Sequence, residues 1–250
     1  MPNTYFQFKQ FRIEQANCAM KVSTDACILG AYVAKNYAQS PRTILDIGAG
    51  TGVLSLMLAQ VSQANITAIE IDEKSFLQAK SNFANSTWKN RLHVFYQSFQ
   101  QYVNTFSATL SYDLLICNPP FFVNSLKSKK KEKNLARHTD SLPFEDLLMG
   151  AEKLTHQGSL FVVLLPTQES EIFENILQDF YLQSTYLQVI EKLFISDNPS
   201  KQPHRVILTL KKLSQNHDSK IITKSLTIKD TTGAYTSNFV DLMKDYYFYL

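Results

Sequence analysis

The sequence predicts an α/β fold: a doubly wound, mostly parallel sheet of seven strands with an antiparallel pair of strands at one edge. Three observations lead to this prediction. Short β-branched runs alternate with segments of helical composition, and a glycine-rich turn separates the first core strand from the next helix. Two late strands are joined by a turn that is too short for a crossover helix.

The first strand, turn and helix are the clearest unit. The apolar run 43–45 is followed by the loop 46–52, which reads Asp-Ile-Gly-Ala-Gly-Thr-Gly, and by a helical apolar pattern over 53–59. Three of the seven glycines of the chain lie in this loop, which indicates positive φ angles or close approach to a ligand. The spacing differs from the dinucleotide pattern G-x-G-x-x-G, so no phosphate is required, and a turn that binds nothing is the alternative.

The later elements continue the alternation. The run 114–117 is apolar without interruption, as is typical of a central strand buried on both faces. The last two strands are joined by a turn that begins at Ser196-Asp197-Asn198-Pro199. In chain order, the sequence predicts strands over 66–72, 92–96, 114–117, 159–166, 186–195 and 205–211, and helices over 73–85, 143–154 and 169–179.

Polar side chains follow three of these strands. Asp46, Glu70 and Asn118 each stand at the carboxyl end of a predicted strand, and ligands of open α/β sheets bind at that edge. Glu70 is placed about right to accept a hydrogen bond from a ribose hydroxyl, and Asp72 can share this role. A surface acid at a strand end is the alternative for either carboxylate. We expect the three strand ends to form one site.

The tetrapeptide Asn118-Pro119-Pro120-Phe121 ends the strand at 114–117. The prolines fix the backbone and remove two N–H donors, so the groups left here are acceptors. The Asn118 side-chain oxygen and the Pro119 carbonyl can both accept from one NH2 group, and Phe121 offers a face for stacking a base. An ordinary proline turn after a strand is the alternative.

A lysine-rich run follows directly. Much of the excess positive charge of the chain is gathered there, beside the expected site. Such a run is often a solvated loop, but in this place it can hold phosphates while a base enters the site. The cations are Lys127, Lys129, Lys130, Lys131, Lys133 and Arg137.

Length and composition set further bounds. A chain of 250 residues without a linker-like segment predicts one domain, with an amino-terminal segment 1–40, a core 41–212 and a carboxyl-terminal extension 213–250. The net charge of +3 excludes neither a nucleic acid nor a small acidic partner. Three cysteines without a C-x-x-C pair and five scattered histidines predict no metal site. No signal peptide or membrane span is seen, so we expect a cytoplasmic protein.

The glycine loop, the acid at the strand end and the Asn-Pro-Pro-Phe tetrapeptide, in this order, resemble the Rossmann-like class I S-adenosylmethionine-dependent methyltransferases. The tetrapeptide is similar to that of the subset that methylates exocyclic or amide nitrogen. Segments 8–30 and 228–247 narrow the resemblance to the bacterial tRNA1(Val) adenine-N6 methyltransferases, and it covers nearly the whole chain, most weakly over 86–112.

This resemblance implies transfer of a methyl group from S-adenosylmethionine to N6 of adenine 37, beside the anticodon of valine tRNA. It implies catalytic roles for Asn118, Pro119, Pro120 and Phe121. In the family an acid after the third strand usually binds the cofactor adenine, whereas this chain offers Gln97 and Ser98, which are weaker acceptors. The cofactor-binding residues implied are Lys21, Thr24, Asp25, Asp46, Gly48, Gly50, Gly52, Glu70, Ile71, Gln97, Ser98 and Asn118.

Other functions remain open from sequence alone. The nearest are N2-guanine rRNA methylation, adenine-N6 methylation of DNA and glutamine methylation of a protein, since related enzymes carry similar tetrapeptides. A non-catalytic cofactor-binding protein that associates with RNA is a different class, and a nicotinamide dehydrogenase has the wrong glycine spacing. The oligomeric state is not fixed by the sequence, and a monomer is favoured.

Overall fold

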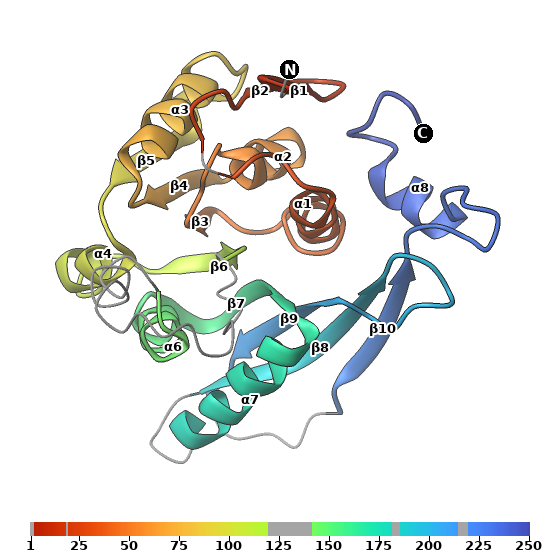
Figure 1. Ribbon diagram of the computed structural model, residues 1–250. Helices are drawn as coiled ribbons and strands as arrows, with labels where there is room; N and C mark the ends of the chain where they lie inside the picture. Colours follow the sequence, from red (N-terminus) through yellow and green to blue (C-terminus); the bar gives the residue numbers. More distant parts are fainter. Residues whose placement is uncertain (1–2, 19, 120–141, 182–185, 215–219) are drawn as a thin grey trace, which may run out of the picture.

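The computed structural model describes residues 3–18, 20–119, 142–181, 186–214 and 220–250. Its main sheet has eight strands in the order β10-β8-β9-β7-β6-β3-β4-β5 (Figure 1). Neighbouring strands are parallel except where β9 pairs antiparallel with β7 and with β8. The predicted α/β fold and its antiparallel pair are confirmed, and the predicted count of seven strands was one too low.

The bounds of the strands are β1 (Tyr5–Gln7), β2 (Arg12–Glu14), β3 (Thr43–Ile47), β4 (Asn65–Glu70), β5 (Leu92–Tyr96), β6 (Tyr112–Cys117), β7 (Thr155–Pro166), β8 (Leu187–Ser196), β9 (Arg205–Lys212) and β10 (Ile222–Thr227). The helices are α1 (Thr24–Asn36), α2 (Val53–Val61), α3 (Glu73–Ala84), α4 (Phe99–Phe106), α6 (Phe144–Lys153), α7 (Thr167–Tyr181) and α8 (Ser237–Met243), with a 3-10 turn η1 at Lys89–Arg91.

The eighth strand, β10, comes from the carboxyl-terminal extension. It pairs in parallel with β8 and lies outside the antiparallel pair. Its first four residues are exposed and Leu226 is its buried side chain, so it lacks the apolar alternation that marks a strand in sequence. The extension therefore contributes to the main sheet as well as to α8.

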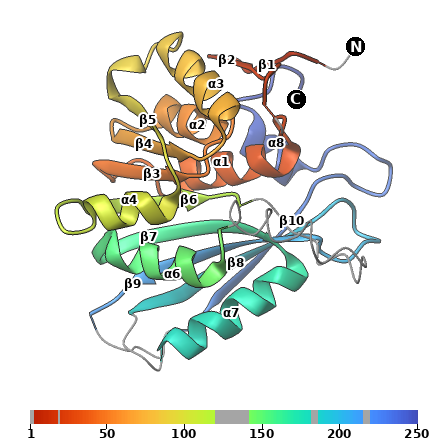
Figure 2. The ribbon, with the colours of Figure 1, turned by 60° about the vertical axis from the view of Figure 1, so that its left-hand side comes forward.

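Helices cover both faces of the sheet (Figure 2). Both faces need cover because the side chains of β6 alternate between two cores. Leu114 and Ile116 pack in the core with α1 and α2. Leu115 and Cys117 pack in the core with α4, α6 and α7. The same alternation runs through β3. A residue's position in its strand therefore decides which layer its side chain enters.

The strands β1 and β2 and the helix α4 are among the elements that were not predicted. The strands β1 and β2 form a separate antiparallel hairpin, which is joined to the rest of the chain where the Asn82 side chain bonds both the N–H and the carbonyl of Glu14. The helix α4 begins with a capping box in which Ser98 and Gln101 each bond the other's backbone N–H. Three-residue strands and an eight-residue helix carry little periodic signal, which explains why both were missed.

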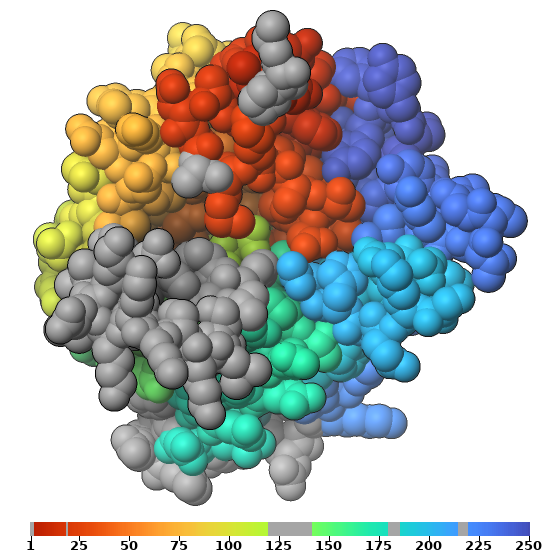
Figure 3. All heavy atoms as spheres, viewed as in Figure 1, coloured from red at the N-terminus to blue at the C-terminus, as the bar shows by residue number. Residues whose placement is uncertain are grey.

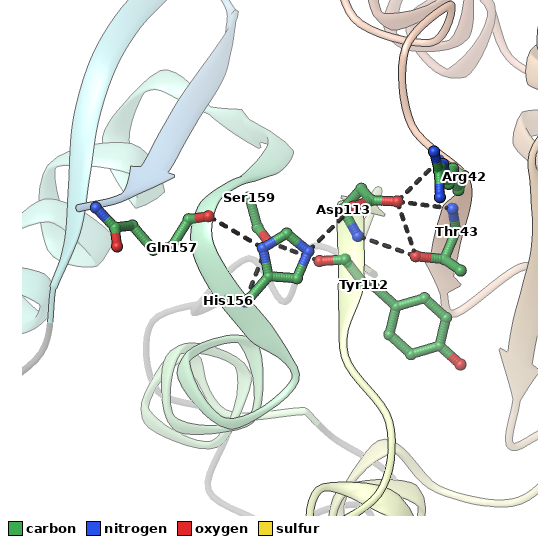
Figure 4. A network of polar contacts seen from close by, with 7 residues as sticks. All are labelled: Arg42, Thr43, Tyr112, Asp113, His156, Gln157 and Ser159. Atoms are coloured by element: carbon green, nitrogen blue, oxygen red, sulfur yellow. Dashed lines mark hydrogen bonds and ion pairs between the residues drawn. The ribbon is translucent and has the colours of Figure 1, made fainter. Parts of the chain in front are cut away.

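A polar cluster joins the amino ends of β3, β6 and β7 (Figure 4). The Asp113 carboxylate accepts hydrogen bonds from the backbone N–H groups of Arg42 at 2.8 Å and Thr43 at 2.9 Å, and from the Thr43 hydroxyl at 3.0 Å. Its other oxygen lies 3.0 Å from His156 Nε2. Burial raises the pKa of Asp113, but the hydrogen bonds from Thr43 and Arg42 outweigh it and hold the pKa below its ordinary value.

Because this pKa is lowered by folding, Asp113 stabilises the protein above its unfolded pKa, about 3.9, and the stabilisation is lost as pH falls through the lower folded value. We expect Asp113→Ala to lower the free energy of unfolding by about 1–3 kcal/mol at pH 7. In urea unfolding, this difference should shrink as the pH approaches 3. His156→Ala, which removes only the half-exposed partner, should have a much smaller effect. Equal losses in the two variants would contradict this assignment.

Candidate functional site

A cavity of about 210 Å³ lies at the carboxyl ends of β3, β4, β5 and β6. Its walls come from the glycine loop, from the strand ends and from the first turns of α3 and α4. The lining residues are Met20, Ile47, Gly48, Gly50, Ile69, Glu70, Ile71, Asp72, Ser75, Gln97, Ser98, Phe99, Gln100, Cys117, Asn118, Pro119 and Leu142. Of the three strand-end residues expected at one site, Glu70 and Asn118 line this cavity.

The glycine loop forms one wall of the cavity. Gly48, Gly50 and Gly52 have φ values of 73°, 56° and 81°, in the left-handed region that favours glycine. Gly48 and Gly50 line the cavity, and a Cβ atom added to either would meet nothing within 4 Å. Gly52 plays a different part, because its Cα faces the Phe83 ring instead of the cavity. Two glycines therefore open the backbone to a ligand, and the third allows the loop to pack on α3.

Glu70 ties the end of β4 to this loop. The side chain is 7% exposed, and its two carboxylate oxygens accept hydrogen bonds from the backbone N–H of Gly50 at 2.7 Å and of Asp72 at 2.8 Å. A carboxylate has about four lone-pair directions, so each oxygen can still accept a hydrogen bond from a ligand hydroxyl. Glu70 therefore shapes the loop and presents an acceptor to the cavity.

Asp46, in contrast, does not line the cavity. Its Oδ2 accepts hydrogen bonds from the Ser55 hydroxyl at 2.7 Å and from the Ser55 N–H at 3.1 Å, on the first turns of α2. Burial raises its pKa to about 6, and the hydrogen bonds from Ser55 act against this shift. The structure therefore places Asp46 between β3 and α2, where it holds the two elements together, and not in direct reach of a ligand.

Gln97 and Ser98 both line the cavity, but their side chains differ in what they already bond. The Ser98 hydroxyl oxygen accepts the Gln101 N–H at 3.2 Å as the N-cap of α4. The Gln97 amide nitrogen is buried and has no hydrogen-bond partner among the described residues. Because an amide can be turned to present either its oxygen or its nitrogen, Gln97 is the better placed of the two to bond a ligand.

Asn118 and Pro119 form the wall at the end of β6. The Asn118 Oδ1 atom is buried, and within the described ranges it has no hydrogen-bond partner. A buried acceptor without a partner costs free energy that a donor from a ligand would recover. The other predicted catalytic and RNA-binding residues, Pro120, Phe121, Lys127, Lys129, Lys130, Lys131, Lys133 and Arg137, lie outside the described residues.

Three residues predicted for the cofactor site lie elsewhere. Thr24 and Asp25 line a second hollow, and Asp25 pairs with Arg205 at 3.0 Å. Lys21 is exposed and donates to the Asn3 carbonyl at 3.0 Å. The N-cap of α1 is Ser23. None of these three residues is among those described as lining the cavity at the glycine loop.

Other lining residues were missed by sequence reasoning. Ile47, Ile69 and Cys117 come from the strand ends, and Phe99 and Gln100 come from the start of α4. The three strand residues belong to the same core layer, so their alternation with their neighbours was a usable signal. Burial raises the pKa of Cys117 well above its ordinary value, which keeps its thiol neutral.

Within the described ranges, no group of three or more His, Cys, Asp and Glu side chains is placed to hold a metal ion. No helix in the same part of the chain is both long and apolar enough to cross a membrane.

Comparison with known proteins places this geometry in a family. Residues 26–191 match the model of the methyltransferase small domain. A tRNA1(Val) (adenine(37)-N6)-methyltransferase of Pseudoalteromonas translucida is 39% identical over 97% of this chain and 97% of its own. One of Flavobacterium psychrophilum is 36% identical over 97% and 98%. In fold, the chain is similar to the structure of a predicted O-methyltransferase from Agrobacterium tumefaciens, with a TM-score of 0.67, 18% identity and coverage of 89% and 96%.

The glycine-loop cavity, the acid at the end of β4 and the asparagine at the end of β6 are thus found in a chain that these relatives match over 97% of its length. The protein is a methyltransferase and belongs to the family of tRNA1(Val) (adenine(37)-N6)-methyltransferases.

Proposed function

We propose that this protein transfers a methyl group from S-adenosylmethionine to N6 of adenine 37 in tRNA1(Val). The main support is the buried Asn118 Oδ1, which has no described partner and lines the cavity beside the glycine loop. An acceptor in this place fits the amino group of a base. The names of the relatives supply the substrate in this proposal.

The cavity residues fit the cofactor. Gly48 and Gly50 leave room for a ligand against the backbone, Glu70 offers acceptors for ribose hydroxyls, and the Gln97 amide suits an adenine edge. S-adenosylmethionine supplies a methyl group that is already activated by the positive charge of its sulfonium. The task left to the protein is to position the two reactants.

Asn118 would act on the amino group of the target base. Its side-chain oxygen and the Pro119 carbonyl accept hydrogen bonds from the two N–H bonds of that group, which favours the pyramidal nitrogen and its growing positive charge. In this proposal Phe121 stacks on the base, and the run Lys127 to Lys133 with Arg137 contacts phosphates. No general base is required, because the proton of the methylated ammonium is acidic and can leave to water.

Gln97 and Ser98 can be told apart by mutation. We expect Gln97→Ala to weaken the binding of S-adenosylhomocysteine by about fivefold to tenfold, the effect of losing one hydrogen bond of about 1 kcal/mol. Ser98→Ala should leave that affinity nearly unchanged and instead lower the free energy of unfolding by about 1 kcal/mol through loss of the cap. Calorimetric titration and urea unfolding measure the two quantities. The reverse pattern would assign the adenine contact to Ser98.

The substrate class is tested by offering several polymers. Purified protein and labelled S-adenosylmethionine are incubated separately with total tRNA from a strain that lacks the modification, with rRNA, with DNA and with release-factor protein. We expect label only on tRNA, recovered after digestion as N6-methyladenosine. Labelled N2-methylguanosine from rRNA would replace the proposal by guanine methylation. Absence of label on every substrate despite cofactor binding would favour a non-catalytic role.

The proposal extends to the domain organisation, the location in the cell and the oligomeric state of the protein. We propose that residues 1–250 act as one domain, because segments from both ends bond to each other: the Lys9 N–H donates to the Tyr246 carbonyl at 2.9 Å. A tRNA substrate implies a cytoplasmic enzyme. We also propose that it acts as a monomer, which size-exclusion chromatography with light scattering would test.

A further inference from the structure

A second hollow, of about 430 Å³, lies apart from the glycine-loop cavity and shares no lining residue with it. Three segments form it: the start of α1, the turn between β8 and β9, and the segment that follows β10. The lining residues are Thr24, Asp25, Asp197, Asn198, Lys201, Ile228, Lys229 and Tyr235. Figure 3 shows the last two segments, in cyan and blue, side by side on the face that also carries the red amino-terminal residues.

The strand register places this hollow at the same edge of the sheet as Asn118. Cys117 pairs with Val163, and β7 then runs three residues further to Pro166, which pairs with Arg205. The turn between β8 and β9 therefore extends beyond the carboxyl end of β7, the strand next to β6. Adjacent strands are about 4.8 Å apart, so β9 lies roughly 10 Å from β6 across this edge, and β10, after which Lys229 and Tyr235 follow, lies roughly 19 Å from β6.

An aromatic ring forms one wall of the hollow. Tyr235 is 46% exposed, and its ring stacks on the buried Phe239 with centroids 4.8 Å apart and an angle of 22° between the planes. A backbone bridge to Lys229 and the turn through Gly233, with φ of 87°, fix the segment that carries it. An exposed aromatic ring that is held in place from behind is suited to contact with a nucleobase.

The hollow is lined by two carboxylates, of Asp25 and Asp197, and by two lysines, Lys201 and Lys229. Its two carboxylates are both paired: Asp25 with Arg205 at 3.0 Å, and Asp197 with Lys201 at 2.9 Å. His204 Nε2 lies within 4 Å of both carboxylates, at 3.6 Å and 3.8 Å. Lys229 is exposed, and its ammonium lies over the Tyr235 ring, 5.6 Å from its centre. A positive charge beside an exposed ring can bind a phosphate and a base of the same nucleotide.

We propose that this hollow binds a nucleotide of single-stranded RNA that flanks the target base, with the nucleobase against Tyr235 and a phosphate at Lys229. This inference rests on the proposed function, since it assigns a further contact surface to the same RNA substrate. It places recognition of the flanking strand on the carboxyl-terminal extension, across the sheet edge from Asn118.

Equilibrium binding of a fluorescein-labelled anticodon stem-loop RNA tests this proposal without requiring turnover. We expect Tyr235→Ala to weaken RNA binding about tenfold, and Tyr235→Phe, which keeps the ring, to retain it. Lys229→Ala should weaken binding and lower the slope of log K against log salt by about one. Affinity for S-adenosylhomocysteine should stay unchanged in all three variants, which also shows that they are folded. Tyr186→Ala is the matched control, because Tyr186 is 41% exposed beside the opposite end of β8.

Unchanged RNA affinity in folded Tyr235→Ala and Lys229→Ala, or an equal loss in Tyr186→Ala, would overturn the proposal. If Tyr235→Ala fails to fold, Lys229→Ala decides the question by itself, because this side chain is exposed. Failure of the proposed function gives a different result: wild-type protein would bind neither the stem-loop nor S-adenosylhomocysteine, or would bind both and transfer no label.

Discussion

Replacing Asn118 by alanine is expected to lower the rate of methyl transfer at least a hundredfold. The substitution removes the buried Oδ1 acceptor that lines the cavity, and an acceptor aimed at a developing charge contributes about 3 kcal/mol, by analogy with one oxyanion-hole donor. Single-turnover transfer of label to tRNA under saturating cofactor measures the chemical step directly.

Binding and folding provide the control for this prediction. Affinity for S-adenosylhomocysteine should fall by much less than the rate, because Gly48, Gly50 and Glu70 remain in place. Asn104→Ala, at an exposed position on α4, should leave both rate and affinity unchanged. Near-normal turnover in Asn118→Ala would rule out Asn118 as the acceptor for the target amino group.

Gly52→Ala is expected to have the largest effect on stability, about 2–5 kcal/mol. Its φ of 81° costs a residue with a side chain about 1–2 kcal/mol. The added Cβ would also lie 2.5 Å from Cε1 of the buried Phe83 ring, and overpacking of this kind costs a further 1–3 kcal/mol or so. Urea unfolding of the protein without ligand measures the change.

Gly158→Ala separates the backbone cost of a positive φ from the cost of overpacking. Gly158 has a similar φ of 91°, but an added Cβ would meet nothing within 4 Å, and the residue is exposed within β7. It should therefore lose only the backbone part, about 1–2 kcal/mol. Equal losses in the two variants would show that Phe83 moves aside freely and that the contact of the loop with α3 is not tight.

The general architecture was predictable because it depends on local patterns. Glycine clustering after β3 and an acid at the end of β4 each appear within a few residues of sequence. The carboxyl ends of parallel strands meet at one edge, and Gly48, Gly50, Glu70 and Asn118 accordingly line one cavity. Asp46 was misplaced, although it stands two residues after Ile44, whose side chain packs in the core with α2. Strict alternation along β3 would have pointed Asp46 to α2.

The features that were not predicted depend on contacts between segments that are distant in sequence. Asp25, at the start of α1, pairs with Arg205, which lies 180 positions further along the chain. The pairing of β10 with β8 is likewise set by backbone hydrogen bonds, since most of its side chains are exposed. Sequence patterns at either position carry no record of such partners. The site was therefore predicted where strand ends define it and missed where tertiary packing does.

One measurement tests the central claim most directly: transfer of label from S-adenosylmethionine to a tRNA1(Val) transcript with adenine at position 37 and to the same transcript with guanine there. We predict one methyl group per molecule of the first transcript, recovered as N6-methyladenosine, and none on the second. Equal labelling of both transcripts, or none on either by protein that binds S-adenosylhomocysteine, would contradict methylation of adenine 37.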